Sequence, residues 1–392
     1  MTGPAGPADP KARATQVLVL AADPASVITE IRLVTPLAPL VASGRIGLRS
    51  LPWHSCRPAD LDGAELVIGQ RPLTARHLQL LQAAHARGAA VVVEIDDLLT
   101  PPAPHLELHA TRGRQAPWVE RAFDEADRVS VSTPRLGEAL ARPGRRFHLV
   151  PNHAWPAARR PAAAEAISPD APGCVLLAAS DAVAAGPAFE ALRRLQAERG
   201  PRLRIVAVGS VAAVAKAAGL HVEAQPVMPR AQFLALAAAL PRAVAVIPLD
   251  DSAFSACKSA VKWFDYAAMG LATLMSDRPP YSDVVEHGHT GRLLPDDASA
   301  WATALATALD DDALRERVAT AAERVVTRQH GLAQSTAAWL ALVEELDAAR
   351  AAGQVRQRQP AWHQRLLAPW YTLAVALRRA NRARLARRQQ PR

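Results

Sequence analysis

Short apolar runs alternate along this chain with stretches of helical periodicity, which predicts strands and helices in alternation. In the first half, the apolar runs cover residues 16–21, 47–51, 66–69 and 89–95, and helices are expected over 28–41 and 75–86. Runs that are apolar at every position are typical of strands buried on both faces, as in a parallel sheet of Rossmann type. No G-x-G-x-x-G follows the first run, so the strongest signature of a dinucleotide-binding dehydrogenase is missing.

The same alternation starts again after a Pro- and Ala-rich stretch, which predicts a second α/β domain. Its apolar runs cover 174–180, 203–209 and 243–249, and its helices are expected over 188–199, 230–239, 298–309, 312–329 and 333–349. With 392 residues, half of them apolar, the chain can bury two cores. The expected segments are a disordered N-terminus (1–14), a first domain (15–155), a linker (156–172), a second domain (173–349) and a basic tail (350–392).

Charge is distributed unevenly between the body and the tail. The net charge is +9, and residues 350–392 contain 11 arginines and no acidic residue, whereas the other 349 residues carry 35 basic and 37 acidic side chains. Because the body is slightly acidic, nucleic acid is not an expected partner. Three widely spaced cysteines, Cys56, Cys174 and Cys257, suggest neither a disulfide framework nor a thiolate zinc site. No secretion signal is expected at residues 1–14, and a reducing cytoplasm fits this composition.

Candidate chemistry concentrates in residues 243–291. An apolar run predicts a strand that hands over, through a turn carrying Asp250 and Asp251, to a helix beginning near Ala256. On that helix Lys258, Lys262 and Asp265 would share one face near its start. Unpaired N–H groups of a first helical turn favour an anion, so the face suits a diphosphate. On spacing alone, the alternative is an ordinary exposed helix face.

A pair of carboxylates, Asp96 and Asp97, follows the fourth strand of the first domain. The carboxyl edge of a parallel sheet is where α/β proteins bind ligands, so the pair could orient an acceptor hydroxyl. The alternative is a turn whose aspartates cap backbone N–H groups. The pair is not a D-x-D motif, and no metal site is expected.

Two sets of residues resemble a known family. The first set is Phe254, Lys258, Ser259, Lys262, Asp265, Tyr266, Ala268, Gly270, Pro280, Tyr281, Gly288 and Gly291. The second is I-D-D-L at 95–98, A-D-R-V-x-V-S-T-P-x-L at 126–136 and V-P-N at 150–152. Together they resemble the group 1 (family 4) glycosyltransferases, which have the GT-B fold of two Rossmann-like domains facing a cleft.

The resemblance implies transfer of a sugar from a nucleoside diphosphate donor, without cofactor or metal and with retention at the anomeric carbon. Lys258 would stabilise the leaving diphosphate, and Asp96 or Asp97 would take the acceptor proton. The implied donor-binding residues are Lys258, Ser259, Lys262, Asp265, Tyr266, Asp251 and Ser180. The chain departs from the family pattern in two places: Cys257 stands where a glutamate is usual, and Asp265 replaces a second glutamate. These departures keep open an alternative, a catalytically inactive nucleotide-binding or scaffold protein.

The tail combines an apolar segment with a basic one. Residues 366–377, LLAPWYTLAVAL, are too short to span a bilayer, and an arginine-rich run follows them. Aromatic and arginine side chains of this kind settle at an anionic membrane surface. We therefore expect a cytoplasmic enzyme that visits the inner membrane face, where a glycan or polyprenyl-linked acceptor of cell-surface polysaccharide synthesis would be met.

Overall fold

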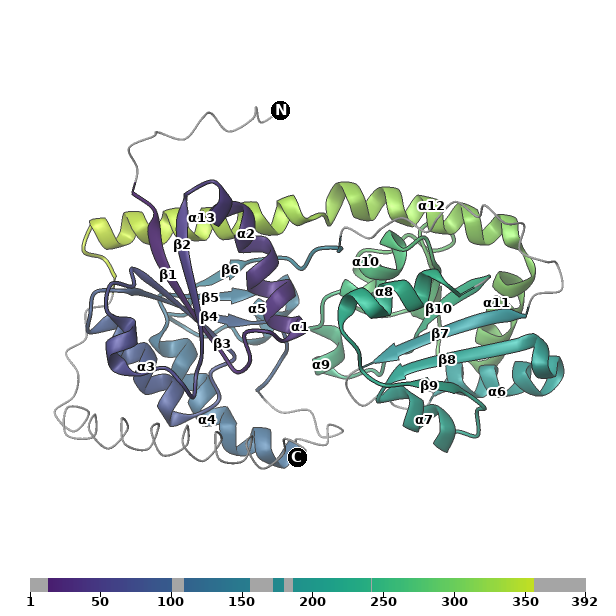
Figure 1. The fold of residues 1–392 in the computed structure, drawn as a ribbon. Coiled ribbons are helices and arrows are strands. Elements are labelled where there is room, and N and C mark those ends of the chain that lie inside the picture. Colours follow the sequence, from purple (N-terminus) through teal and green to yellow (C-terminus); the bar gives the residue numbers. More distant parts are fainter. Residues whose placement is uncertain (1–12, 101–108, 156–171, 180–185, 241, 356–392) are drawn as a thin grey trace, which may run out of the picture.

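The computed structural model describes residues 13–100, 109–155, 172–179, 186–240 and 242–355, which form two α/β domains (Figure 1). The predicted disordered N-terminus up to residue 12, the linker residues 156–171 and the tail from residue 356 lie outside the described residues. Each domain contains one six-stranded sheet, and every strand pair in both sheets is parallel.

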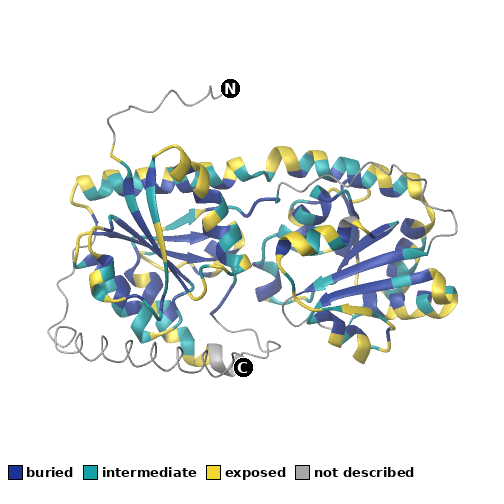
Figure 2. Cartoon of the chain, in the orientation of Figure 1, coloured by how far each residue is buried: buried dark blue, intermediate teal, exposed yellow. Residues whose placement is uncertain are grey.

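The four predicted apolar runs of the first domain correspond to the first four strands of the first sheet, and its last two strands were not predicted. In spatial order its strands are β2 (Ile46–Pro52), β1 (Thr15–Ala21), β3 (Leu66–Gln70), β4 (Ala90–Ile95), β5 (Arg128–Val131) and β6 (Phe147–Leu149). Its helices are α1 (Val27–Thr29), a π-helical turn (Glu30–Val34), α2 (Thr35–Ala42), α3 (Ala75–His85), α4 (His109–Glu125) and α5 (Pro134–Ala139). Every residue of β3 and β4 is buried, as strands covered on both faces require (Figure 2).

The second sheet repeats this construction. In spatial order its strands are β12 (Arg292–Leu294), β11 (Ala272–Ser276), β10 (Ala243–Ile247), β7 (Gly173–Ala179), β8 (Leu203–Gly209) and β9 (Glu223–Gln225). Its helices are α6 (Pro187–Arg199), α7 (Val211–Ala217), α8 (Arg230–Ala238), α9 (Ala253–Ala256), α10 (Val261–Ala268), α11 (Ala298–Asp310) and α12 (Asp312–Gln329). Short 3-10 turns occupy Pro58–Leu61, Gly200–Arg202 and Tyr281–Asp283.

The run of three aspartates at 310–312 serves local structure. Asp311 caps α12, because its carboxylate accepts a hydrogen bond from the Leu314 amide at 2.8 Å, and Asp310 pairs with Arg199.

The last described helix, α13 (Leu332–Ala351), belongs to the first domain, which corrects the predicted boundary at residue 349. Figure 1 shows α12 running along the second domain and α13 continuing along the first. Trp339 is fully buried, and its indole Nε1 donates to the Arg32 carbonyl at 2.9 Å. Leu342 and Leu346 pack into the cluster that holds Leu37. Apolar burial against the first sheet therefore fixes this helix.

None of the described helices is long and apolar enough to cross a bilayer.

Candidate functional site

Residues that follow strands of the two sheets meet at the domain junction. Thr133, just after β5, donates its hydroxyl to the Cys257 carbonyl, just after α9, at 2.9 Å. A pocket of about 490 Å³ opens there, a size typical of small-molecule sites. Its walls come from both domains and include Ser132, Thr133, Asn152, Lys258, Ser259 and Phe264.

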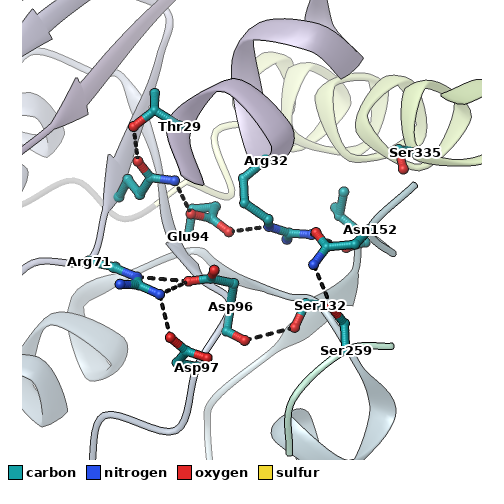
Figure 3. Close-up of polar contacts among 12 residues, drawn as sticks. Thr29, Arg32, Arg71, Glu94, Asp96, Asp97, Ser132, Asn152, Ser259 and Ser335 are labelled. Atoms are coloured by element: carbon teal, nitrogen blue, oxygen red, sulfur yellow. Dashed lines mark hydrogen bonds and ion pairs between the residues drawn. The ribbon is translucent and has the colours of Figure 1, made fainter. Parts of the chain in front are cut away.

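The predicted acidic pair lies at the carboxyl end of β4 and is bound by an arginine. Arg71 Nε donates to Asp96 at 2.7 Å, and Arg71 Nη2 donates to Asp97 at 2.5 Å (Figure 3). The Arg71 backbone has φ +46°, a left-handed conformation that few residues other than glycine adopt. The two aspartate side chains keep 14% and 18% of their surface exposed. They are thus oriented by a guanidinium and still reachable from solvent.

Behind this pair lies a buried polar network. Its Arg32 and Gln70 belong to the family resemblance, but the sequence patterns do not predict its hydrogen bonds. The Glu94 carboxylate is fully buried and accepts hydrogen bonds from Arg32 Nε at 2.7 Å and from Gln70 Nε2 at 2.8 Å. Thr29 donates in turn to Gln70 at 2.6 Å. Burial raises the pKa of Glu94, while the positive charge of Arg32 opposes that shift.

Arg32 extends the network into the second domain (Figure 3). Its Nη1 donates to the Val150 carbonyl at 2.6 Å and to Asn152 Oδ1 at 2.8 Å. Asn152 Nδ2 then donates to the Ser259 hydroxyl at 2.6 Å. Arg32 lies in the π-helical turn, and such turns often occur at functional sites. A continuous set of hydrogen bonds therefore joins the edge of the first sheet to Ser259.

Lys258 and Ser259 do not lie on a helix, which corrects the prediction of one continuous helix from Ala256. Helix α9 ends at Ala256 and α10 begins at Val261, so both residues lie in the connection between them. Lys258 therefore does not share a helix face with Lys262 and Asp265. Its ammonium lies 4.6 Å from the centre of the Phe254 ring, a cation–π contact. The connection still precedes the first turn of α10, where backbone N–H groups lack helical acceptors.

Asp265 lies on α10, and two partners hold its carboxylate. Arg230, at the start of α8, forms an ion pair with it, and the Trp155 amide donates a hydrogen bond to it. Burial raises the pKa of Asp265 to about 6, although Arg230 and the Trp155 amide oppose the shift. The Asp265 side chain is 14% exposed.

The other predicted donor-binding residues occupy different surroundings. Tyr266 is 1% exposed and packs in the core beside Phe233, so its ring has a packing role. Asp251 lies exposed in the turn after β10, and Lys262 lies half-buried in the first turn of α10. Ser180 lies outside the described residues.

A buried histidine at the junction was missed by sequence reasoning. His153 is 1% exposed, and neither ring nitrogen has a hydrogen-bond partner among the described residues. Burial, together with the charges of Arg230 and Arg32, lowers the pKa of His153 to about 4, so the ring is neutral at physiological pH. Its position next to the V-P-N motif was the available signal. In the described part of the chain, no group of three or more His, Cys, Asp or Glu side chains is placed to hold a metal ion.

Comparison with solved structures identifies the fold. The sucrose-phosphate synthase of Thermosynechococcus elongatus is 14% identical, with a TM-score of 0.60 over 86% of this chain and 100% of that one. The chain has the GT-B fold. HepE of Anabaena in complex with UDP-glucose is 13% identical, with a TM-score of 0.59 over 84% of this chain and 99% of that one. The predicted pair of Rossmann-like domains facing a cleft is thereby confirmed.

The chain is also similar to solved structures with other descriptions. A putative UDP-N-acetylglucosamine 2-epimerase from Listeria monocytogenes is 12% identical, with a TM-score of 0.52 over 88% of this chain and 100% of that one. The chain spans only 54–57% of the length of the GtfA/B and TarM chains that it matches. No protein-family model and no curated protein matches the sequence.

Proposed function

We propose that this protein is a glycosyltransferase that moves a sugar from a nucleoside diphosphate donor to a glycan or lipid-linked acceptor. One observation carries the proposal: Lys258 and Ser259 precede the first turn of α10, at a pocket that both domains line. An ammonium, a hydroxyl and the start of a helix in one place suit the charge that develops on a leaving diphosphate.

The remaining steps are assigned to the carboxyl end of β4, where Asp96 and Asp97 lie next to this pocket's Ser132 but do not line the pocket themselves. Asp96 or Asp97 would accept the proton of the acceptor hydroxyl, once the hydroxyl displaces part of their contact with Arg71. Closure of two domains over the reacting groups would exclude the water that hydrolyses donors. Transfer without a metal and with retention at the anomeric carbon is part of the proposal.

UDP is the nucleotide to test first. HepE and TarM, which share the fold, have been crystallised with UDP. Because the Listeria monocytogenes structure is described as a putative epimerase, the fold alone does not select transfer. A transfer and hydrolysis assay with a panel of UDP-sugars separates an active transferase from an inactive nucleotide-binding scaffold.

Replacing Lys258 with alanine should weaken UDP binding by more than about tenfold, because one charge-assisted contact to the diphosphate is worth about 1.5–3 kcal/mol. The melting temperature should change little, since Lys258 is only half-buried. Calorimetric titration with UDP measures the first quantity and thermal unfolding the second.

The matched control is Lys216→Ala, which removes an exposed lysine from α7 of the same domain. Lys216→Ala should bind UDP as the wild type does. Equal affinity of wild type and Lys258→Ala would show that Lys258 does not hold the diphosphate.

Replacing Asp96 or Asp97 with asparagine should leave UDP affinity unchanged and lower turnover in at least one variant. An amide cannot accept the acceptor proton, so a loss of about 100-fold is expected at the residue that acts as base. Steady-state rates with a UDP-sugar measure the effect, and Asp62→Asn, which alters the exposed pair with Arg87, is the control. Normal turnover in both variants would show that Asp96 and Asp97 only stabilise the turn and take no part in catalysis.

The acceptor and the membrane role rest on the sequence of the tail. A chain truncated after Arg350 should not sediment with anionic vesicles, whereas the full chain should do so at low salt only, since each arginine contributes about 1 kcal/mol. If the truncated chain sediments with the vesicles, or if the full chain does not, the tail has no role at a membrane surface.

A further inference from the structure

The segment that carries Lys258 is embedded in the opposite domain. Phe254 and Cys257, on α9 and directly after it, are 4% and 5% exposed. They belong to the apolar cluster formed by the first sheet and its helices, together with Leu98, Val131 and Leu136. We call residues 254–259 the docked segment.

Polar contacts hold the docked segment on both sides of Lys258. Before it, the Thr133 hydroxyl donates to the Cys257 carbonyl at 2.9 Å, and the Cys257 thiol donates to the Arg135 carbonyl at 3.7 Å. After it, Asn152 donates to the Ser259 hydroxyl at 2.6 Å. All three contacts join the second domain to residues of the first domain, of which Asn152 lies just after its last strand, β6.

These contacts determine where Lys258 lies. Its ammonium lies 4.6 Å from the centre of the Phe254 ring, and that ring is fixed in the core of the first domain. Because a long lysine side chain loses considerable rotamer entropy when it binds a ligand, holding it beforehand lowers the cost of binding.

We propose that Thr133 is a positioning residue: the first domain, through the docked segment, sets the place of Lys258 and thereby the affinity of the second domain for a nucleoside diphosphate. The inference rests on the proposed function of Lys258. It also explains Cys257, because a glutamate at this position would bury a carboxylate in an apolar cluster at considerable cost.

Thr133→Val and Thr133→Ser form the decisive pair of variants. Valine keeps the shape and removes the hydroxyl, whereas serine keeps the hydroxyl. We expect Thr133→Val to weaken UDP binding by about fivefold or more and Thr133→Ser to bind within about twofold of wild type, the difference being one hydrogen bond.

Thr133 also caps α5, since it accepts from the Leu136 amide at 3.2 Å. Thr74→Val is therefore the control, because Thr74 caps α3 in the same way, accepting from the His77 amide at 3.3 Å. It should lower the melting temperature as Thr133→Val does and leave UDP affinity unchanged. An equal loss of UDP affinity in Thr74→Val would show that the effect of Thr133→Val comes from the lost helix cap, and it would overturn the proposal.

Two further measurements separate positioning from direct contact. In a Lys258→Ala background, Thr133→Val should cause no additional loss of UDP affinity, because it acts through Lys258. Without ligand, the amides of the docked segment should exchange hydrogen faster in Thr133→Val than in Thr133→Ser.

The outcomes also separate this inference from the proposed function. If wild type binds no nucleoside diphosphate, the proposed function fails, while hydrogen exchange still tests the docking. Unchanged protection of residues 254–259 in Thr133→Val, or additive losses in the double variant, would overturn the positioning role.

Discussion

Replacing Arg32 with methionine is expected to lower the free energy of unfolding by about 3–5 kcal/mol, because it leaves Glu94 as a buried charge without its partner. The two side chains are 1% and 0% exposed, and their ion pair is 2.7 Å long. Methionine fills a similar volume, so little of the loss comes from a cavity. Denaturant unfolding monitored by circular dichroism measures this change in the free energy of unfolding.

A second substitution should restore much of that stability. In Arg32→Met/Glu94→Gln the buried charge is gone, and the glutamine can still bind Gln70, so we expect the loss to shrink by more than half. The control is Arg87→Met, which breaks the exposed pair with Asp62 and should cost less than about 1 kcal/mol. If the double variant is no more stable than Arg32→Met, the uncompensated charge is not the cause.

The pH dependence of Arg32→Met has a definite sign. Burial raises the pKa of Glu94, and removal of Arg32 takes away the charge that opposes this shift. A carboxyl group whose pKa is raised in the folded state stabilises the fold at low pH and loses that contribution as pH rises. The deficit of Arg32→Met relative to wild type should therefore be smaller at pH 5 than at pH 8.

Replacing Asp265 with asparagine is expected to weaken UDP binding by about 10–150-fold, corresponding to the loss of a charge-assisted hydrogen bond of about 1.5–3 kcal/mol to the ribose hydroxyls. Titration calorimetry below the melting temperature of the variant measures this. Asp296→Asn, which weakens the exposed pair with Arg278 in the same domain, should bind normally. A donor complex in which Asp265 faces away from the ribose would refute the assignment.

Proton competition gives an independent test of Asp265. Its pKa is raised to about 6 by burial, so the carboxylate is increasingly protonated below that pH. UDP affinity of wild type should fall as pH drops from 7 to 5, whereas that of Asp265→Asn should be flat over the same range.

The contribution of Asp265 to the free energy of unfolding changes with pH in the opposite direction to its contribution to binding. Because its pKa is raised in the folded state, this contribution stabilises the fold at low pH and is lost as pH rises through about 6. Protonation of Asp265 does not unfold the protein, so lost binding at pH 5 would report on the site.

The sequence predicts elements well where local signals decide them. Helix α12 begins and ends at the predicted residues, Asp312 and Gln329, because Asp311 supplies a cap and the apolar periodicity is regular. The buried strands β1, β3, β4, β7, β8 and β10 were predictable because each is a mainly apolar run, whereas the short strand β11, also fully buried, was not predicted. The GT-B arrangement came from residue motifs that resemble a family, since periodicity does not specify how two domains face each other.

The parts that were not predicted depend on distant contacts. The break between α9 and α10 arises where Phe254 and Cys257 pack on the other domain, which no helical spacing encodes. Helix α13 joins the first domain because Trp339 meets the carbonyl of Arg32, 307 residues earlier. The sequence therefore predicted which residues belong to the site. It did not predict their arrangement in space, because that arrangement depends on packing between residues far apart in the chain.

The backbone passes between the domains at two places that lie side by side. In the segment leaving the first domain, the Ala154 amide donates to the His330 carbonyl at 2.7 Å, where α12 ends and α13 follows. Two such crossings at one edge act as a pivot. A rotation of one domain against the other about this edge would leave the Ala154–His330 bond in place, and it would displace contacts farther from the edge, such as that between Thr133 and Cys257, by larger distances.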